Sequence, residues 1–221
     1  MSKEENILLV EGSDDLYAIA ELMGHYTDWP RDRKLNPVQI IDSGGVEKLL
    51  KKENISTRMK SASMKNIGVV VDADNDCQPR WDELKNLFKD YFPAIPEKLP
   101  SNGLICENNE GKRLGIWIMP DNSSQGMLET FLSTLIHTPE SENHLWMHAI
   151  KSTNAAKQLN AIFRDAHLDK AKIHSWLAWQ DPPGDAFGTA ILRKVLNPSM
   201  PSAQIFAKWF MDLYKLPALN Q

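Results

Sequence analysis

Acidic residues recur in this sequence directly after short apolar runs, and their types and spacing suit a divalent metal ion. Glu11 follows the run 6–10, and Asp72, Asp74 and Asp76 alternate along the chain after the run 67–71. Carboxylates gathered at one place repel one another and have raised pKa values unless a cation lies among them. Mg²⁺ and Mn²⁺ prefer oxygen ligands and keep several waters, so a few carboxylates are enough to bind one. We therefore predict a Mg²⁺ or Mn²⁺ site.

Two further carboxylates extend the predicted metal site. Asp121 follows the run 114–118, and Glu129 lies in the helical pattern that comes next. A second ion about 4 Å from the first would suit an in-line phosphoryl displacement, although Glu129 is equally well explained as an ordinary exposed helix residue. The predicted metal ligands are Glu11, Asp72, Asp74, Asp76, Asp121 and Glu129.

A second set of residues could assist at the same place. Asp14 and Asp15 are either further site acids or residues that cap a helix. The run Ser43, Gly44 and Gly45 opens a helix, where free backbone amides could hold phosphate, but turn chemistry alone also explains it. A cation late in the chain could stabilise phosphate charge, with solvated lysines and a core histidine as the alternative; these candidates are Lys170, Lys172 and His174.

The elements that must position these residues alternate between strand and helix. Apolar runs typical of strands covered on both faces occupy 6–10, 38–41, 67–71 and 114–118, with a fifth candidate at 103–106. Helical patterns occupy 14–24, 46–52, 80–91 and 124–136. This alternation predicts an α/β fold with a mostly parallel sheet of about four strands. Ligands of such sheets bind at the carboxyl ends of the strands, where the acids lie.

The strand signal ends at about His137. The remaining sequence predicts helices broken at Pro139, at 181–184 and at 197–201. We therefore predict an α/β domain over residues 1–137 and a helical extension over 138–221 that packs on it.

Composition limits the classes of function. The chain has 42% hydrophobic and 24% charged residues and a net charge of −4, which argues against coating nucleic acid through global positive charge but not against local phosphate binding. Its apolar runs are shorter than the ~18 residues of a membrane span, and no secretory signal is visible. Cys77 and Cys106 lack metal-binding spacing, so we expect free thiols in a cytoplasmic protein without a membrane partner.

The segments LLVEGSDD and VVVDADND, with an SGG turn between them, resemble the Toprim domain. That domain is shared by topoisomerases, bacterial primases, recombination mediators, ribosomal-RNA maturases and the overcoming-lysogenization-defect nucleases. The resemblance covers residues 6 to about 135, and its hallmark is matched by Glu11 after the first strand and by Asp72 and Asp74 after the third. The whole chain also resembles an uncharacterised family of small, stand-alone, Toprim-like bacterial proteins. The similar segments are GIWIMPDN, GMLETFL and KAKIHSWLAWQDPPG, from Gly115, Gly126 and Lys170.

The resemblance implies metal-dependent phosphoryl transfer on nucleic acid, either DNA or RNA. Asp72 and Asp74 would hold metal, and Glu11 would act on protons or on a second ion, which makes these three the predicted catalytic residues. No tyrosine has the setting of a topoisomerase nucleophile, and the chain lacks the additional parts of primases, so hydrolysis by a nuclease is the favoured reaction. The alternative is a non-catalytic Toprim-like module that binds nucleic acid or a partner protein.

Overall fold

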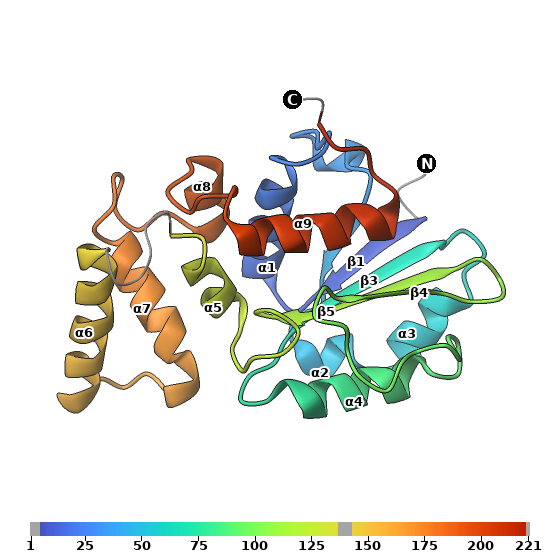
Figure 1. Cartoon of the computed structure of the whole chain (residues 1–221), viewed down its shortest axis with the longest axis horizontal. Helices are drawn as coiled ribbons and strands as arrows, with labels where there is room; N and C mark the ends of the chain where they lie inside the picture. The colour runs from blue at the N-terminus through green and yellow to red at the C-terminus, as the bar shows by residue number, and fades with distance from the viewer. Residues whose placement is uncertain (1–4, 137–142, 220–221) are drawn as a thin grey trace.

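The computed structural model describes residues 5–136 and 143–219. Within them, a five-stranded sheet has the order β2-β1-β3-β5-β4 (Figure 1). Its strands are β1 (Asn6–Val10), β2 (Gln39–Asp42), β3 (Asn66–Asp72), β4 (Leu104–Glu107) and β5 (Arg113–Met119). Strands β2, β1, β3 and β5 run parallel to one another, and β4 pairs antiparallel with β5 at the edge.

The predicted α/β class and mostly parallel sheet are therefore confirmed, while the expected number of about four strands is corrected to five. The additional strand is the fifth candidate. It runs antiparallel because only five residues, 108–112, separate β4 from β5. A connection that short forms a hairpin, whereas a parallel pair needs a crossover of about a dozen residues or more.

Apolar side chains on the two faces of the sheet build two hydrophobic cores. On β3, for example, Val70 faces one core and Val69 and Val71 face the other. Helices α3 (Lys52–Met59) and α4 (Cys77–Phe88) cover one face, next to the short α2 (Val46–Leu49), and α1 (Ser13–Met23) and α9 (Pro201–Tyr214) cover the other (Figure 1). Burial on both faces explains why the central strands are apolar throughout.

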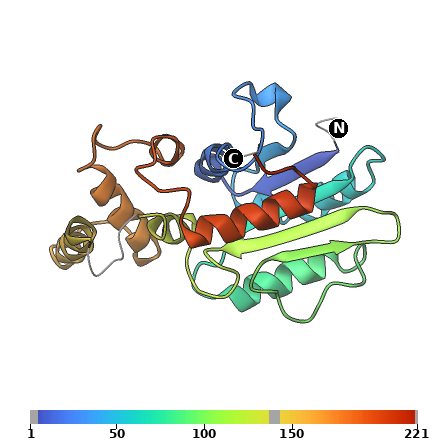
Figure 2. The same ribbon diagram turned by 45° about the horizontal axis from the view of Figure 1, so that its top comes forward.

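The last helix, α9, lies directly on the sheet (Figure 2). The Tyr214 hydroxyl donates a hydrogen bond to the Ile7 carbonyl (2.7 Å), and Trp209 Nε1 donates to the Leu104 carbonyl (3.0 Å). Gly68 makes this close approach feasible, because a Cβ there would lie 2.7 Å from a Leu8 methyl group and closer still to the Tyr214 hydroxyl. The C-terminal part of the chain therefore contributes to the same core as the sheet.

Between the sheet and α9 the chain forms further helices. These are α5 (Leu128–Ser133), α6 (His144–Gln158), α7 (Leu168–Leu177) and α8 (Phe187–Leu192), with a short 3₁₀ turn, η2 (Asp165–His167), before α7. Another 3₁₀ turn, η1 (Arg33–Leu35), lies between α1 and β2. Helices α6 and α7 form a hairpin that projects beyond the sheet (Figures 1 and 2), held by an edge-on contact of Trp146 with Trp176. No helix in the described ranges is long and apolar enough to cross a bilayer.

The helices differ from their predicted bounds mainly where turn residues intervene. The pattern 46–52 divides into α2 and the start of α3, and the pattern 124–136 shortens to α5. The predicted breaks at 181–184 and 197–201 are confirmed, since they separate α7, α8 and α9. The predicted break at Pro139 and the predicted boundary between residues 137 and 138 lie outside the described residues.

Candidate functional site

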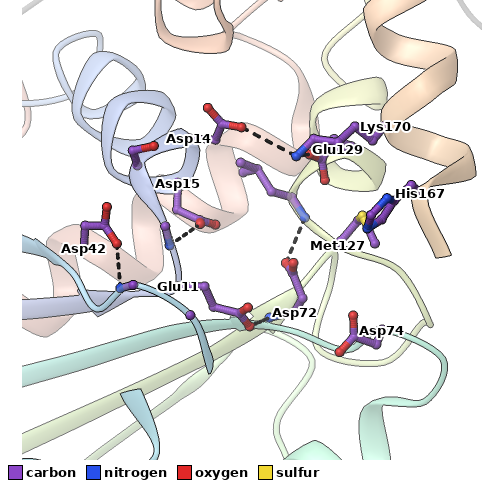
Figure 3. Close-up of a pocket in the computed structure, with 15 residues that line it drawn as sticks. Glu11, Asp14, Asp15, Asp42, Asp72, Asp74, Met127, Glu129, His167 and Lys170 are labelled. Atoms are coloured by element: carbon purple, nitrogen blue, oxygen red, sulfur yellow. Dashed lines mark hydrogen bonds and ion pairs between the residues drawn. The ribbon is translucent and has the colours of Figure 1, made fainter. Parts of the chain in front are cut away.

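A cavity of about 480 Å³ lies at the carboxyl ends of β1, β2 and β3 and faces α5 and α7 (Figure 3). Parallel strands place the residues that follow them at one edge, which is why acids distant in sequence meet here. The residues that line it are Glu11, Gly12, Ser13, Asp14, Asp15, Asp42, Gly44, Gly45, Asp72, Asp74, Met127, Leu128, Glu129, His167 and Lys170.

Glu11 and Asp72 lie beside each other and are linked through the backbone. The Asp72 amide donates to Glu11 Oε1 (2.8 Å), and Asp72 Oδ1 accepts from the Leu128 amide (2.9 Å) at the start of α5. Burial raises the pKa of Asp72 well above its ordinary value, and the charges of Glu11, Asp15 and Glu129 add to this effect. Burial also raises the pKa of Glu11. Both side chains are thus held in place, and a nearby cation would favour their charged forms.

Asp15 caps the start of α1 and also lines the cavity. Its Oδ2 accepts from the Gly12 amide (3.0 Å), as expected of an acid in the first turn of α1. It is also buried and lines the cavity, and burial together with the charges of Glu11 and Glu129 raises its pKa to about 7. A carboxyl used only for capping on the surface would not carry this shift.

Asp74 adopts an unusual backbone conformation, and its side chain contacts Arg80. Its φ of 54° is in the left-handed region, which few residues other than Gly, Asn and Asp adopt. Its amide and carbonyl pair with Gly126 (2.9 and 2.8 Å) in the loop before α5. Asp74 Oδ2 lies 3.1 Å from Arg80 Nη2, and Arg80 Nε donates to the Asp72 carbonyl (3.1 Å). Arg80 therefore partly neutralises the charge of Asp74.

Glu129 and Lys170 join the sheet edge to the α6–α7 hairpin. Lys170 Nζ lies 2.9 Å from Glu129 Oε1, whose side chain is only 4% exposed, and 3.6 Å from Asp14 Oδ2. Burial acts to lower the pKa of Lys170, but the hydrogen bonds and charges of Glu129 and Asp14 outweigh it and raise the pKa. The lysine thus provides a stable positive charge on the wall opposite Glu11, as Figure 3 shows.

Asp76 and Asp121, both predicted metal ligands, form hydrogen bonds within their own turns and do not line the cavity. Asp76 caps α4, where its Oδ1 accepts from the Gln78 amide (2.9 Å). Asp121 accepts four hydrogen bonds from the amides and hydroxyls of Ser123 and Ser124. Partial burial acts to raise the pKa of Asp121, but these bonds outweigh it and lower the pKa.

The secondary candidates divide in the same way. Lys172 pairs with Asp169 (2.8 Å) outside this cavity, and His174 stacks on Phe187 with 4.9 Å between ring centroids. Ser43 is likewise not part of the lining.

The glycine turn after β2 lines the cavity but has no free amides. The Gly44 amide donates to Asp42 Oδ1 and the Gly45 amide to the Glu11 carbonyl, both at 2.8 Å. Their φ angles of 70° and 110° favour glycine. The amides of both glycines are therefore already hydrogen-bonded within the protein, which supports the turn interpretation over phosphate binding.

The donor set of the cavity suits a hard divalent cation. Among the described residues that line it, seven are carboxylates and one is a lysine, so the site carries excess negative charge supplied by oxygen ligands. No three of the described His, Cys, Asp and Glu side chains already surround a common point as metal ligands. Residues such as Asp74 would have to turn from their present partners to complete a shell.

Sequence reasoning missed several residues of the site. Asp42 ends β2, and its position was the signal that could have selected it. Arg80, Met127 and His167 had no such signal, because only the packing of α4, α5 and α7 brings them to the sheet edge.

Comparison with known proteins gives one match. No curated protein and no solved structure is significantly similar to the chain. A family model described as a protein of unknown function, DUF3226, matches residues 5–215, which include the whole sheet, the cavity and the α6–α7 hairpin. The chain therefore belongs to the DUF3226 family.

Proposed function

We propose that the protein is a Mg²⁺- or Mn²⁺-dependent, Toprim-like nuclease that acts on DNA or RNA. The observation that carries the proposal is that Glu11 and Asp72 lie side by side, both partly buried, at the carboxyl ends of adjacent parallel strands. Both carboxyls have pKa values raised by burial. Such an arrangement costs stability unless a cation is bound there, and perturbed carboxyls in a cavity are typical of functional sites.

Two features support the relationship to the Toprim domain. The parallel strands are ordered β2-β1-β3-β5, and Glu11 directly follows β1 while Asp72 ends β3 and Asp74 lies just beyond it. These are the positions of the acidic hallmark on which the sequence resemblance rests.

Asp72 and Asp74 would hold the metal ion in this proposal, with Glu129 next to them, and Glu11 would act on protons or on a second ion. When bound, the ion would neutralise charge on a phosphoryl group and activate a water molecule. The chain itself supplies the rest. The Leu128 amide fixes Asp72, and Lys170 on the opposite wall can hold a phosphate oxygen. Burial makes Glu11 a stronger base than an exposed glutamate, which suits it to accept a proton.

A non-catalytic module that binds nucleic acid or a partner protein is the second candidate. Asp74 and Glu129 are already ion-paired with Arg80 and Lys170, and no ready set of three metal ligands exists among the described residues. An edge at which ion pairs already neutralise part of the carboxylate charge can serve as a binding surface without chemistry.

A cleavage screen distinguishes the two candidates. Single- and double-stranded DNA and RNA are incubated with the protein in Mg²⁺, Mn²⁺ or EDTA. We expect metal-dependent cleavage that falls by about two orders of magnitude or more in Glu11→Gln, the scale of losing a general acid or base. Asp90→Asn, which changes a carboxylate with an exposed side chain outside the cavity, is the matched control. Equal cleavage by Glu11→Gln and wild type would refute the assigned site, and binding without any cleavage would favour the module.

We also propose the cytoplasm as the location of the protein. Cys77 and Cys106 support this, because both are free thiols in the structure and reducing compartments preserve free thiols. Cell fractionation tests the proposal, and recovery from an oxidising compartment would contradict it.

A further inference from the structure

The tip of the α6–α7 hairpin, residues 159–167, borders the cavity. His167 ends the tip and lines the cavity with Lys170 of α7. A second cavity of about 340 Å³ lies between the tip and the strand end, since Asp74, Asp165 and Ala166 all line it. A chain-like ligand that reached Asp74 would therefore pass along the tip.

The hairpin is basic although the protein is acidic. Residues 143–180 contain five basic and two acidic side chains, so their net charge is +3, whereas the whole chain carries −4 and the remainder therefore −7. The charged residues are Lys151, Lys157, Arg164, Lys170, Lys172, Asp165 and Asp169. A polyanion is thus attracted to the hairpin rather than to the rest of the surface.

The tip exposes large apolar side chains. Ile162 is fully exposed (101%) and Leu159 is 82% exposed, more than any other large apolar residue in the described part of the chain. Neither belongs to a hydrophobic core. Exposed apolar side chains rimmed by polar groups are typical of binding sites.

The backbone of the tip is fixed, so that these side chains are presented outward. Helix α6 ends at Gln158, Asn160 just beyond it adopts the left-handed conformation (φ 65°), and the Ala161 amide donates back to the Ala156 carbonyl (3.0 Å). Lys157 donates to the Phe163 carbonyl and lies 4.9 Å above the Phe163 ring.

Arg164 completes the tip. It is exposed, and its guanidinium donates to His167 Nε2 (2.9 Å), which places a permanent positive charge between the apolar tip and the cavity. This charge is suitably placed for a phosphate of a strand that enters the site.

We propose that the hairpin tip binds single-stranded nucleic acid, with Leu159 and Ile162 against the face of an unpaired base and Arg164 on a neighbouring phosphate. The inference rests on the proposed function for the class of ligand. A single strand is favoured over a duplex because only unstacked bases offer apolar faces, whereas a duplex presents mainly phosphates to a protruding tip. The hairpin then guides a strand toward the carboxylates.

Fluorescence anisotropy of labelled oligonucleotides with the full chain in EDTA tests the proposal. The probes are single-stranded DNA, single-stranded RNA and the matching duplexes. A Leu159→Ser, Ile162→Ser double variant should weaken single-strand binding by about tenfold, the scale of losing one base contact, and leave duplex binding unchanged. Arg164→Gln should weaken binding to all probes and reduce the salt dependence by about one phosphate contact. Leu35→Ser, in η1 and 67% exposed, is the matched control and should bind as wild type does.

Single-strand binding by the double variant equal to that of wild type would overturn the inference, as would the absence of any binding by wild type. A wild type that self-associates in sedimentation, with a monomeric double variant that still binds oligonucleotides normally, would assign the tip to contact between copies. Activity is read separately in Mg²⁺ and Mn²⁺. If the double variant loses single-strand binding but the wild type cleaves nothing, the inference stands and the nuclease proposal is refuted. If the wild type cleaves but the double variant binds single strands as well as wild type does, the nuclease proposal stands and the inference is refuted.

Discussion

Replacing Asp15 with asparagine is expected to stabilise the metal-free protein at neutral pH. Asp15 is 7% exposed, and its pKa is raised to about 7 because burial penalises the charged form and Glu11 and Glu129 repel it. The side-chain amide of the asparagine would retain an oxygen acceptor for the Gly12 amide, which Asp15 contacts at 3.0 Å. The substitution therefore removes the charge with little change in shape or hydrogen bonding.

The sign and size of the effect follow from proton linkage. In the unfolded chain the carboxyl titrates near 3.8 and in the folded protein near 7, so the folded state holds the proton more tightly. Asp15 therefore lowers the free energy of unfolding as the pH rises from about 4 to about 7, with no further loss above that range. One pKa unit corresponds to about 1.4 kcal/mol, which gives a loss of roughly 2–3 kcal/mol between about pH 5 and pH 7.5.

Urea denaturation in EDTA at about pH 5 and pH 7.5 measures this loss. We expect the wild type to lose roughly 2–3 kcal/mol more than Asp15→Asn between the two conditions. Asp90→Asn is the control, since the Asp90 side chain is 64% exposed and lies 3.8 Å from Lys52, and surface pairs contribute about 0–1 kcal/mol. It should follow the wild type. Parallel loss by wild type and Asp15→Asn would refute the view that a buried Asp15 charge strains the metal-free site.

Three further perturbations test how the site is held together. Lys170→Met should destabilise the protein by about 1–2 kcal/mol, because it leaves the buried Glu129 without its cation; the effect is limited because Lys170 itself is partly exposed. Adding Glu129→Gln to this variant should restore most of the lost free energy of unfolding. Strictly additive effects of the two substitutions would contradict the ion pair. Tyr214→Phe should cost about 1–2 kcal/mol in urea denaturation, because the buried Ile7 carbonyl loses the donor 2.7 Å away, and unchanged stability would argue against that bond. Gly126→Ala should cost roughly 1–3 kcal/mol, because φ is 136° and the new Cβ would lie 2.6 Å from a side-chain oxygen of α5; a thermal melt equal to that of wild type would show that the loop relaxes freely.

Local sequence predicted the sheet that carries the site. The continuous apolar runs of β1, β3 and β5 could be recognised because strands covered on both faces have no polar side to alternate with. Helical patterns between them implied parallel crossovers, and parallel strands bring their carboxyl ends to one edge. Glu11 and Asp72 could therefore be placed together before the structure was known.

Sequence could not decide which of the other acids join them. Asp76 and Asp121 lie just beyond strand ends and Asp72 lies at one, yet Asp76 and Asp121 bond to amides two or three residues away. Asp side chains readily form such local turns and caps, and the type of residue does not reveal which choice is made. Asp74 joins the cavity because its left-handed backbone pairs with Gly126 far along the chain.

The length, apolar strand runs and acidic strand ends of this chain thus determined an α/β sheet with carboxylates at one edge. Only the tertiary structure decided that Lys170 and His167 of the C-terminal part face those carboxylates, and that Glu129 is buried against Lys170. Periodicity reports which face of a helix is apolar, but it carries no information on where that helix docks. The docking of α7 is set by the shape of the shared core, to which residues from both ends of the chain contribute.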